Sequence, residues 1–356
     1  MPQPPGRLPP LENTTPVWNR AWIVVSRAAE IPDNTPVQVL VAGEAWVVTR
    51  IDGVLTAFED RCPHRHSPLS AGSVTRAEDG SPRLTCAVHG WRFDATGQCD
   101  LMPGDGRAGR TGDSRLGQHG HGHHGHGHRG WHGRHDKQGR GDKEDRPPES
   151  VTLRRAYGIT ERYGLVWLAV DEPLAPLPEF REWADDGMDG THCQPVRVQA
   201  SAGQVIDGFL DTAGVVTADG WQVTGVVETP YEDSGQAPGR HRSIVAAGPS
   251  ATVHRRLELP HATIGILITA QPEDRGITRV FKLVTRDDLG GDLTLVEKFA
   301  AAEDQDLAEN LALLEGYASV PLSLDEEAAG AGPVTGSPGS QLNLAWRRLM
   351  AQAVRA

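Results

Sequence analysis

Apolar and polar residues alternate with a period of two in the first part of the chain, in short runs that are separated by Gly, Pro and Asp. The clearest runs are residues 21–25, 37–41 and 46–58, and the last of these turns at Asp52-Gly53. Alternation of this kind is typical of half-buried β-strands, and Asp-Gly is typical of a two-residue hairpin turn. The pattern therefore predicts a small antiparallel β domain that begins near Trp18.

The alternation stops completely between residues 104 and 149, where Gly, His, Arg and Asp dominate. This segment holds eight of the fifteen histidines of the chain, and its composition cannot supply a packed core. We expect a disordered insertion, with binding of zinc, nickel or copper as the functional alternative. Because alternation resumes over residues 151–170, the insertion is expected to interrupt a single domain that spans residues 18–172.

A proline-rich stretch, residues 173–178, precedes the second half of the chain. A short helix is expected over residues 203–213, a long acidic helix over 293–317 and a C-terminal helix over 341–354. Strands are expected at residues 221–229, 241–247, 251–259, 263–270 and 277–285. This order predicts a twisted antiparallel sheet wrapped around one long helix in residues 173–356, and thus an α+β chain of two domains.

Composition narrows the possible partners and locations. The 35 Lys and Arg residues against 47 Asp and Glu give a formal charge of -12, which argues against a nucleic acid or an anionic membrane surface as partner. No run approaches the length of a membrane span, and residues 1–17 form a polar stretch that we expect to be a disordered tail. Four cysteines with no enforced pairing favour a reducing compartment, so we expect a cytoplasmic protein.

Two short elbows carry the candidate chemistry. The first is Cys62-x-His64 and the second is Cys86-x-x-His89, so each offers one thiolate and one imidazole. Two cysteines and two histidines match a [2Fe-2S] cluster of the Rieske type, in which histidines replace two of the cysteines and raise the reduction potential. A structural Cys2His2 zinc site uses the same ligand types, but it normally pairs cysteine with cysteine and histidine with histidine.

The residues around the elbows extend this pattern. Cys62-Pro63-His64-Arg65 is followed by Pro68-Leu69-Ser70 and Gly72, and Cys86-x-x-His89 by Gly90-Trp91-x-Phe93-Asp94. These motifs resemble the Rieske domain of the Rieske non-haem iron oxygenases. The resemblance implies a [2Fe-2S] cluster held by Cys62, His64, Cys86 and His89, followed by a helix-grip (START/Bet v 1-like) domain. It also implies a ferredoxin or flavin reductase as electron donor, and a trimeric assembly.

The same resemblance implies a mononuclear iron in the second domain, bound by two histidines and one carboxylate. When the family's histidine motif is placed on residues 208–219, Asp211 falls on the aspartate that relays electrons between subunits. Gly214 and Asp219 fall where the two histidines should be, and Asp304 falls on the carboxylate ligand. Mononuclear Fe(II) is therefore doubtful, and Asp219 with Asp304 would be only a remnant of its site.

Three functions fit these observations. The first is a Rieske protein that transfers electrons through its cluster but lacks oxygenase chemistry, in a homotrimer or in a mixed trimer with an active oxygenase subunit. The second is an active monooxygenase, a hydroxylase or demethylase of a small aromatic or natural-product substrate, with an unusual iron site. The third is a metal-binding protein whose function resides in the histidine-rich residues 104–149. Whether the chain is an enzyme stays open at this point.

Overall fold

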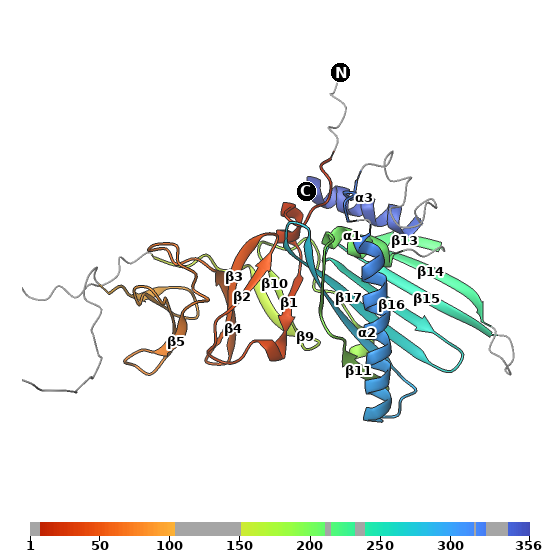
Figure 1. Ribbon diagram of the computed structural model, residues 1–356, viewed down its shortest axis with the longest axis horizontal. Helices are drawn as coiled ribbons and strands as arrows, with labels where there is room; N and C mark the ends of the chain where they lie inside the picture. Colours follow the sequence, from red (N-terminus) through yellow and green to blue (C-terminus); the bar gives the residue numbers. More distant parts are fainter. Residues whose placement is uncertain (1–7, 104–150, 211–214, 232–238, 317, 325–340) are drawn as a thin grey trace, which may run out of the picture.

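The structure is a computed structural model that describes residues 8–103, 151–210, 215–231, 239–316, 318–324 and 341–356. It forms an elongated body in which the N-terminal strands lie at one end and a large sheet lies at the other (Figure 1). Antiparallel sheets dominate, with three α-helices among the described residues. The predicted α+β class, a small β domain followed by a sheet that grips a long helix, is confirmed.

The N-terminal domain contains three antiparallel sheets, in the orders β1-β10-β9, β2-β3-β4 and β5-β6-β7-β8. Its elements are η1 (Pro16–Arg20), β1 (Ile23–Arg27), η2 (Ala28–Glu30), β2 (Val37–Val41), β3 (Glu44–Ile51), β4 (Val54–Glu59), β5 (Ser73–Arg76), β6 (Pro82–Thr85), β7 (Arg92–Phe93), β8 (Cys99–Leu101), β9 (Gly158–Arg162) and β10 (Leu165–Ala169). The predicted hairpin joins β3 to β4, and both turn residues have positive φ, +55° at Asp52 and +76° at Gly53. This backbone geometry is why the turn uses Asp-Gly.

The C-terminal domain is built on one eight-stranded antiparallel sheet. Its order is β11-β18-β17-β16-β15-β14-β13, and β12 pairs with β18 as well. The strands are β11 (Asp189–His192), β12 (Val196–Val198), β13 (Val215–Asp219), β14 (Gln222–Tyr231), β15 (Gly239–Ala247), β16 (Thr252–Glu258), β17 (Thr263–Asp274) and β18 (Ile277–Arg286). The helical elements are η3 (Arg181–Ala184), α1 (Ala202–Phe209), α2 (Leu293–Glu315) and α3 (Gln341–Arg355).

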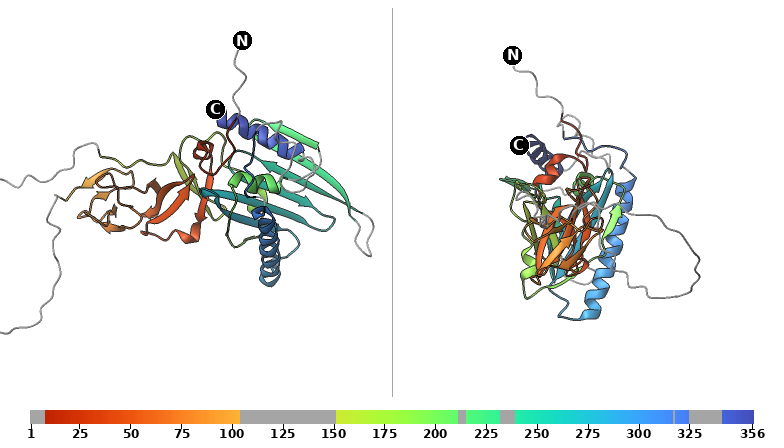
Figure 2. Two further views of the ribbon diagram at one scale, coloured as in Figure 1. Left: turned by 45° about the horizontal axis from the view of Figure 1, so that its top comes forward. Right: turned by 90° about the vertical axis from the view of Figure 1, so that its left-hand side faces the viewer.

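Helix α2 lies along one face of this sheet, and α3 lies near β13 and β14 (Figure 2). The α2 helix is preceded by the N-cap residue Asp292, whose carboxylate accepts hydrogen bonds from the backbone N–H of Thr294 and Leu295. Such an N-cap satisfies amides that have no partner within the helix. Its buried side chains Leu307, Leu311 and Leu314 recur at the spacing of one helix face, so the long helix is held by packing against the domain.

The two domains share their hydrophobic interior. One core cluster joins Val24 of β1 and Trp167 of β10 to Leu267 of β17 and Phe281 of β18. Backbone hydrogen bonds also cross the boundary, from Ala42 N–H to the Pro272 carbonyl at 2.7 Å and from Gly43 N–H to the Glu273 carbonyl at 3.0 Å. The boundary is therefore a packed seam between the domains.

Part of the predicted N-terminal tail belongs to this seam. Leu11 is only 1% exposed, and the Asn13 amide donates hydrogen bonds to the carbonyls of Asp274, at 2.9 Å, and Ile277, at 2.8 Å. Asn13 Oδ1 accepts from Ala202 N–H at 2.7 Å. The prediction of a disordered tail over residues 1–17 is thus wrong for residues 8–17, while residues 1–7 lie outside the described residues.

The predicted insertion, residues 104–149, lies outside the described residues, but the chain on either side of it is described. Cys99 N–H donates a hydrogen bond to the Val151 carbonyl at 2.9 Å, and Thr152 Oγ1 donates to Gln98 Oε1 at 3.0 Å. The two ends of the segment are therefore adjacent, and β9 and β10 complete the sheet that β1 begins. None of the described helices is long and apolar enough to cross a membrane.

Candidate metal centre

The first elbow follows directly after β4 and is a tight loop. Cys62 N–H donates to the Ser67 carbonyl at 2.9 Å, and His66 N–H donates back to the Cys62 carbonyl at 2.8 Å. His66 has a φ of +58°, a conformation that lets the chain reverse within a few residues. The loop therefore presents Cys62 and His64 from one compact turn.

A buried carboxylate anchors this elbow to the domain. Asp60, 7% exposed, accepts hydrogen bonds from Ser70 N–H at 2.7 Å and from Ser70 Oγ at 2.6 Å. It also accepts from Gln38 Nε2 of β2 at 2.6 Å. Because Asp60 and Ser70 lie on opposite sides of the elbow in sequence, one side chain fixes both ends of the loop.

The second elbow connects β6 to β7 and has the same architecture. Cys86 N–H donates to the Trp91 carbonyl at 2.8 Å, and Gly90 N–H donates to the Cys86 carbonyl at 3.0 Å. Gly90 has a φ of +70°, which favours glycine at this position. At Gly72 a Cβ would lie 2.1 Å from the Thr85 carbonyl oxygen, so glycine there allows the two elbows to approach each other.

The four predicted ligands lie close together, with the two cysteines on one side of the site and the two histidines on the other. The ring centroids of His64 and His89 lie 4.5 Å apart in an edge arrangement, and Trp91 stacks on His64 at 4.9 Å. Cys62 and Cys86 are buried, at 1% and 2% exposure, and each thiol influences the pKa of the other. The sulfur pair therefore lies inside and the imidazole pair lies nearer the surface, which matches two thiolates on one iron and two imidazoles on the other.

Burial and hydrogen bonds to sulfur act in opposite directions on the pKa values of the two thiols. Burial raises the pKa of the Cys62 thiol to about 11, although backbone N–H groups of His64 and Arg65 favour its thiolate. Burial also raises the pKa of Cys86, but hydrogen bonds from Ser67 and from backbone N–H groups of the elbow outweigh it and lower the pKa below the ordinary thiol value. In both elbows, hydrogen-bond donors therefore point at a cysteine sulfur. Such donors stabilise the negative charge that a cysteine carries when it binds a cluster.

Asp304, the predicted carboxylate ligand of the second domain, lies on α2. Its Oδ1 accepts a hydrogen bond from Gln194 N–H, in the connection between β11 and β12, at 2.7 Å. Beside it, Lys282 of β18 is 1% exposed and forms ion pairs with Glu303, at 2.6 Å, and Asp306, at 2.9 Å. Burial lowers the pKa of Lys282, but these two carboxylates outweigh burial and raise it. The acidic segment of α2 is therefore already paired within the protein.

Asp219, the other predicted remnant, lies far from this segment. The α1 helix ends at Phe209, and Asp219 is an exposed residue at the end of strand β13, where it pairs with Gln222. Strand β13 forms one edge of the sheet, whereas Asp304 contacts the connection beside β11 at the opposite edge, six strand spacings or roughly 29 Å away along the sheet. The structure does not bring Asp219 and Asp304 together.

Two other positions of the predicted second site, Asp211 and Gly214, lie outside the described residues. The predicted helix over residues 203–213 is shorter than expected, because its last described helical residue is Phe209. A strand has begun by Val215, so the spacing of the family's histidine motif does not continue along one helix here. The role of Asp211 as an electron relay stays a prediction.

Sequence reasoning missed a charged cluster on the face of the sheet away from α2. Glu182 of η3, 4% exposed, lies 3.0 Å from His254 Nε2 and accepts from Arg256 Nη1 at 3.1 Å. Burial raises the pKa of Glu182, but these partners outweigh it and lower the pKa to about 2. Period-two alternation along β16 does place His254 and Arg256 on one face, but nothing in the sequence pairs them with Glu182.

Part of the chain matches a known domain family. The Rieske [2Fe-2S] domain family matches residues 21–111. Methylxanthine N3-demethylase NdmB of Pseudomonas putida is 41% identical over 75 residues, which are 21% of this chain and 21% of that protein. Pheophorbide a oxygenase, chloroplastic, of Oryza sativa subsp. japonica is 32% identical over 106 residues, 28% of this chain and 19% of its own length. The sequence matches thus span about a fifth of these curated relatives.

Solved structures extend the likeness to nearly the whole chain. Pseudomonas putida CBB5 NdmB superimposes with a TM-score of 0.72 at 16% identity, over 96% of this chain and 92% of its own. Apo dicamba monooxygenase superimposes with a TM-score of 0.67 at 17% identity, over 95% and 97% of the two chains. The chain therefore carries a Rieske [2Fe-2S] domain, and its overall fold is the one found in Rieske non-haem iron oxygenases.

Proposed function

We propose that this chain is an electron-transfer protein of the Rieske type, built on the oxygenase fold but without the mononuclear iron. Cys62 and Cys86 would hold one iron of the cluster, and His64 and His89 would hold the other. When bound, the cluster accepts and donates one electron at a time. The protein buries the sulfur side of the site and leaves the imidazole edges nearer the surface, where an electron can leave.

The observation that carries the second half of the proposal is the pairing of the α2 carboxylates. Lys282 supplies a buried positive charge to Glu303 and Asp306, and a backbone amide occupies Asp304. A metal ion on Glu303 or Asp306 would have to displace Lys282 and leave a buried ammonium without its carboxylates, which is costly, and at Asp304 it would compete with the amide on Oδ1. The exposed carboxylate of Asp219 lies across the sheet and offers no second ligand.

Partners follow from the proposed chemistry. A ferredoxin or flavin reductase would deliver electrons to the cluster, and docking near the half-buried His64 and His89 would keep the transfer distance short. An active oxygenase subunit would receive the electrons in a mixed trimer. The net charge of -12 would favour a donor that presents a basic surface.

Metal analysis tests the proposal directly. Iron and acid-labile sulfide are measured per chain on protein purified without oxygen, together with the electron paramagnetic resonance spectrum after dithionite reduction. We expect two irons, two sulfides and a Rieske-type signal. The variant Asp304→Asn should contain the same amount of iron as the wild type. A third iron that is lost in Asp304→Asn would overturn the proposal.

An active monooxygenase is the second candidate, and the likeness over nearly the whole chain to a demethylase and to dicamba monooxygenase favours it. Such an enzyme would act on a small aromatic or natural-product substrate. It requires the third iron, so the same metal analysis separates the two candidates. If the third iron is found, oxygen uptake that depends on both a reductase and an added substrate would identify the monooxygenase.

A further inference from the structure

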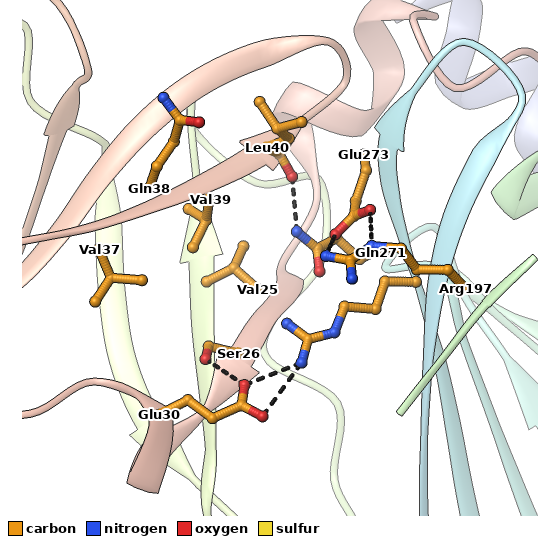
Figure 3. A pocket seen from close by; sticks show the side chains of 11 residues that line it. Val25, Ser26, Glu30, Val37, Gln38, Val39, Leu40, Arg197, Gln271 and Glu273 are labelled. Carbon is orange, nitrogen blue, oxygen red and sulfur yellow. Dashed lines mark hydrogen bonds and ion pairs between the residues drawn. The ribbon is translucent and has the colours of Figure 1, made fainter. Parts of the chain in front are cut away.

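A cavity of about 360 Å³ lies at the seam between the two domains (Figure 3), and none of the residues that line it belongs to either elbow or to the acidic segment of α2. Its walls come from β1, η2 and β2 of the N-terminal domain and from β12, β17 and β18 of the C-terminal domain. This volume falls within the range of small-molecule sites, which occur preferentially at domain interfaces. The proposed electron transfer assigns no role to this cavity.

One side of the cavity is apolar. Val25, 1% exposed, and Val39, 6% exposed, line it together with Val37. These side chains come from β1 and β2, which belong to different sheets of the N-terminal domain but contact each other, and they form an aliphatic surface that can pack against a flat or aliphatic ligand (Figure 3). Such a surface contributes affinity without selecting for charge.

The opposite side is polar, and its charged side chains form ion pairs with one another. Arg279 Nη2 donates to both carboxylate oxygens of Glu30, at 3.2 and 3.0 Å. Arg197 donates to Glu273 through Nε at 2.7 Å and Nη2 at 2.9 Å. Arg27 Nε also donates to Glu30, at 3.0 Å, so both carboxylates and both lining guanidinium groups are already engaged in ion pairs, and a charged ligand would have to disrupt one of these pairs. The cavity therefore favours an uncharged ligand.

Hydrogen-bonding capacity is left over on this polar side. Gln271 is 1% exposed and donates through Nε2 to the Leu40 carbonyl at 2.8 Å, but its Oε1 has no hydrogen-bond partner among the described residues. A buried acceptor without a donor costs free energy, so such an atom is a natural contact for a ligand N–H. Arg279 uses only Nη2 toward Glu30, which leaves the N–H groups of Nε and Nη1 for an acceptor.

We propose that this seam cavity binds a small neutral molecule that carries an amide group. The amide N–H donates to Gln271 Oε1, the amide carbonyl accepts from Arg279, and the apolar part of the ligand packs on Val25 and Val39. The site uses none of the four cluster ligands and would hold its ligand whether or not the second domain binds iron.

Three isosteric probes test the chemical class. Benzamide, benzoate and benzamidine share one ring and a planar substituent, and they are neutral, anionic and cationic respectively. Each is titrated into the full, cluster-loaded chain by isothermal titration calorimetry. We expect benzamide to bind at least tenfold more tightly than either charged probe. Absence of benzamide binding, or tighter binding of a charged probe, would overturn the proposal.

Variants locate the binding within the cavity. Gln271→Leu keeps the side-chain volume but removes the acceptor, and it should weaken benzamide binding by roughly fivefold. Val39→Phe fills the apolar side and should abolish binding, while Val54→Ala, an exposed residue in the β3–β4 hairpin, serves as the control and should bind as the wild type does. Arg279→Lys, which keeps the charge beside Glu30, should also weaken binding. Unchanged affinity in the folded variants of Val39 and Gln271 would place benzamide elsewhere and refute the site.

Discussion

Lowering the pH should decrease the free energy of unfolding of this protein by an amount that depends on the protonation of Glu182. Burial by itself would raise the pKa of this carboxyl, but His254 and Arg256 hold it at about 2, against an ordinary value of 4.5. At about 1.36 kcal/mol for each pH unit, this difference corresponds to about 3 kcal/mol. Because the folded-state pKa is depressed, this stabilisation is fully present above about pH 4.5 and is lost as the pH falls toward 2.

Urea unfolding followed by tryptophan fluorescence measures this contribution. Glu182→Gln should lower the free energy of unfolding by about 3 kcal/mol at pH 7, since it removes the charge that pairs with Arg256. By pH 3 about 2 kcal/mol of the difference between wild type and variant should be gone, because the unfolded wild type then takes up a proton that the folded protein does not. Comparing the two proteins at each pH cancels the contributions of titrating groups that do not contact Glu182.

Glu179→Gln is the matched control. Glu179 also pairs with an arginine, Arg181, at 3.0 Å, but these side chains are 63% and 87% exposed. An exposed pair of this kind contributes about 0–1 kcal/mol, so this variant should unfold almost as the wild type does at both pH values. Equal destabilisation by the two substitutions, or a Glu182→Gln effect of the same size at pH 7 and pH 3, would refute the reasoning.

Three further predictions concern the cluster and the fold. Cys86→Ser should abolish the visible absorbance and bound iron of the cluster, whereas Cys99→Ser, which alters another buried cysteine, should keep both in the same spectroscopic and iron assays. Arg347→Met should lower the free energy of unfolding by about 3–5 kcal/mol in urea titrations, because it leaves the buried carboxylate of Asp207 without its partner at 2.6 Å. Deletion of residues 104–149 should leave the electron paramagnetic resonance spectrum of the reduced cluster unchanged, and a shifted or lost signal would show that this segment supports the elbows.

The sequence predicted the elements best where short-range patterns determine them. The expected strand over residues 263–270 corresponds to β17, and the expected helices over 293–317 and 341–354 correspond to α2 and α3 within a few residues. Both elbows could be read from residue types because each is a local turn closed by its own backbone hydrogen bonds. These helices, this strand and both elbows are determined by residues close to one another in the sequence.

Features that depend on distant contacts could not be predicted in this way. Asn13 is buried because it bonds to carbonyls more than 260 residues along the chain, and no local pattern marks it. The sequence also could not tell whether Asp219 and Asp304 lie close together, because sequence spacing does not determine at which edge of the sheet a residue lies: Asp219 is on edge strand β13, and Asp304 of α2 contacts the connection beside β11 at the other edge. The Glu182 cluster likewise depends on the packing of η3 against β16.

The two ends of the segment that follows β8 lie next to each other, so this point of the chain can accept inserted sequences. The hydrogen bond from Cys99 to Val151 closes the domain as though the intervening residues were absent. Lengthening a loop whose ends are already held together adds little to its closure entropy, since each doubling of length costs only about 0.6 kcal/mol. Evolution could therefore exchange whole sequences at this junction without redesigning the cluster, and a reporter domain or an affinity handle could be inserted there by the same route.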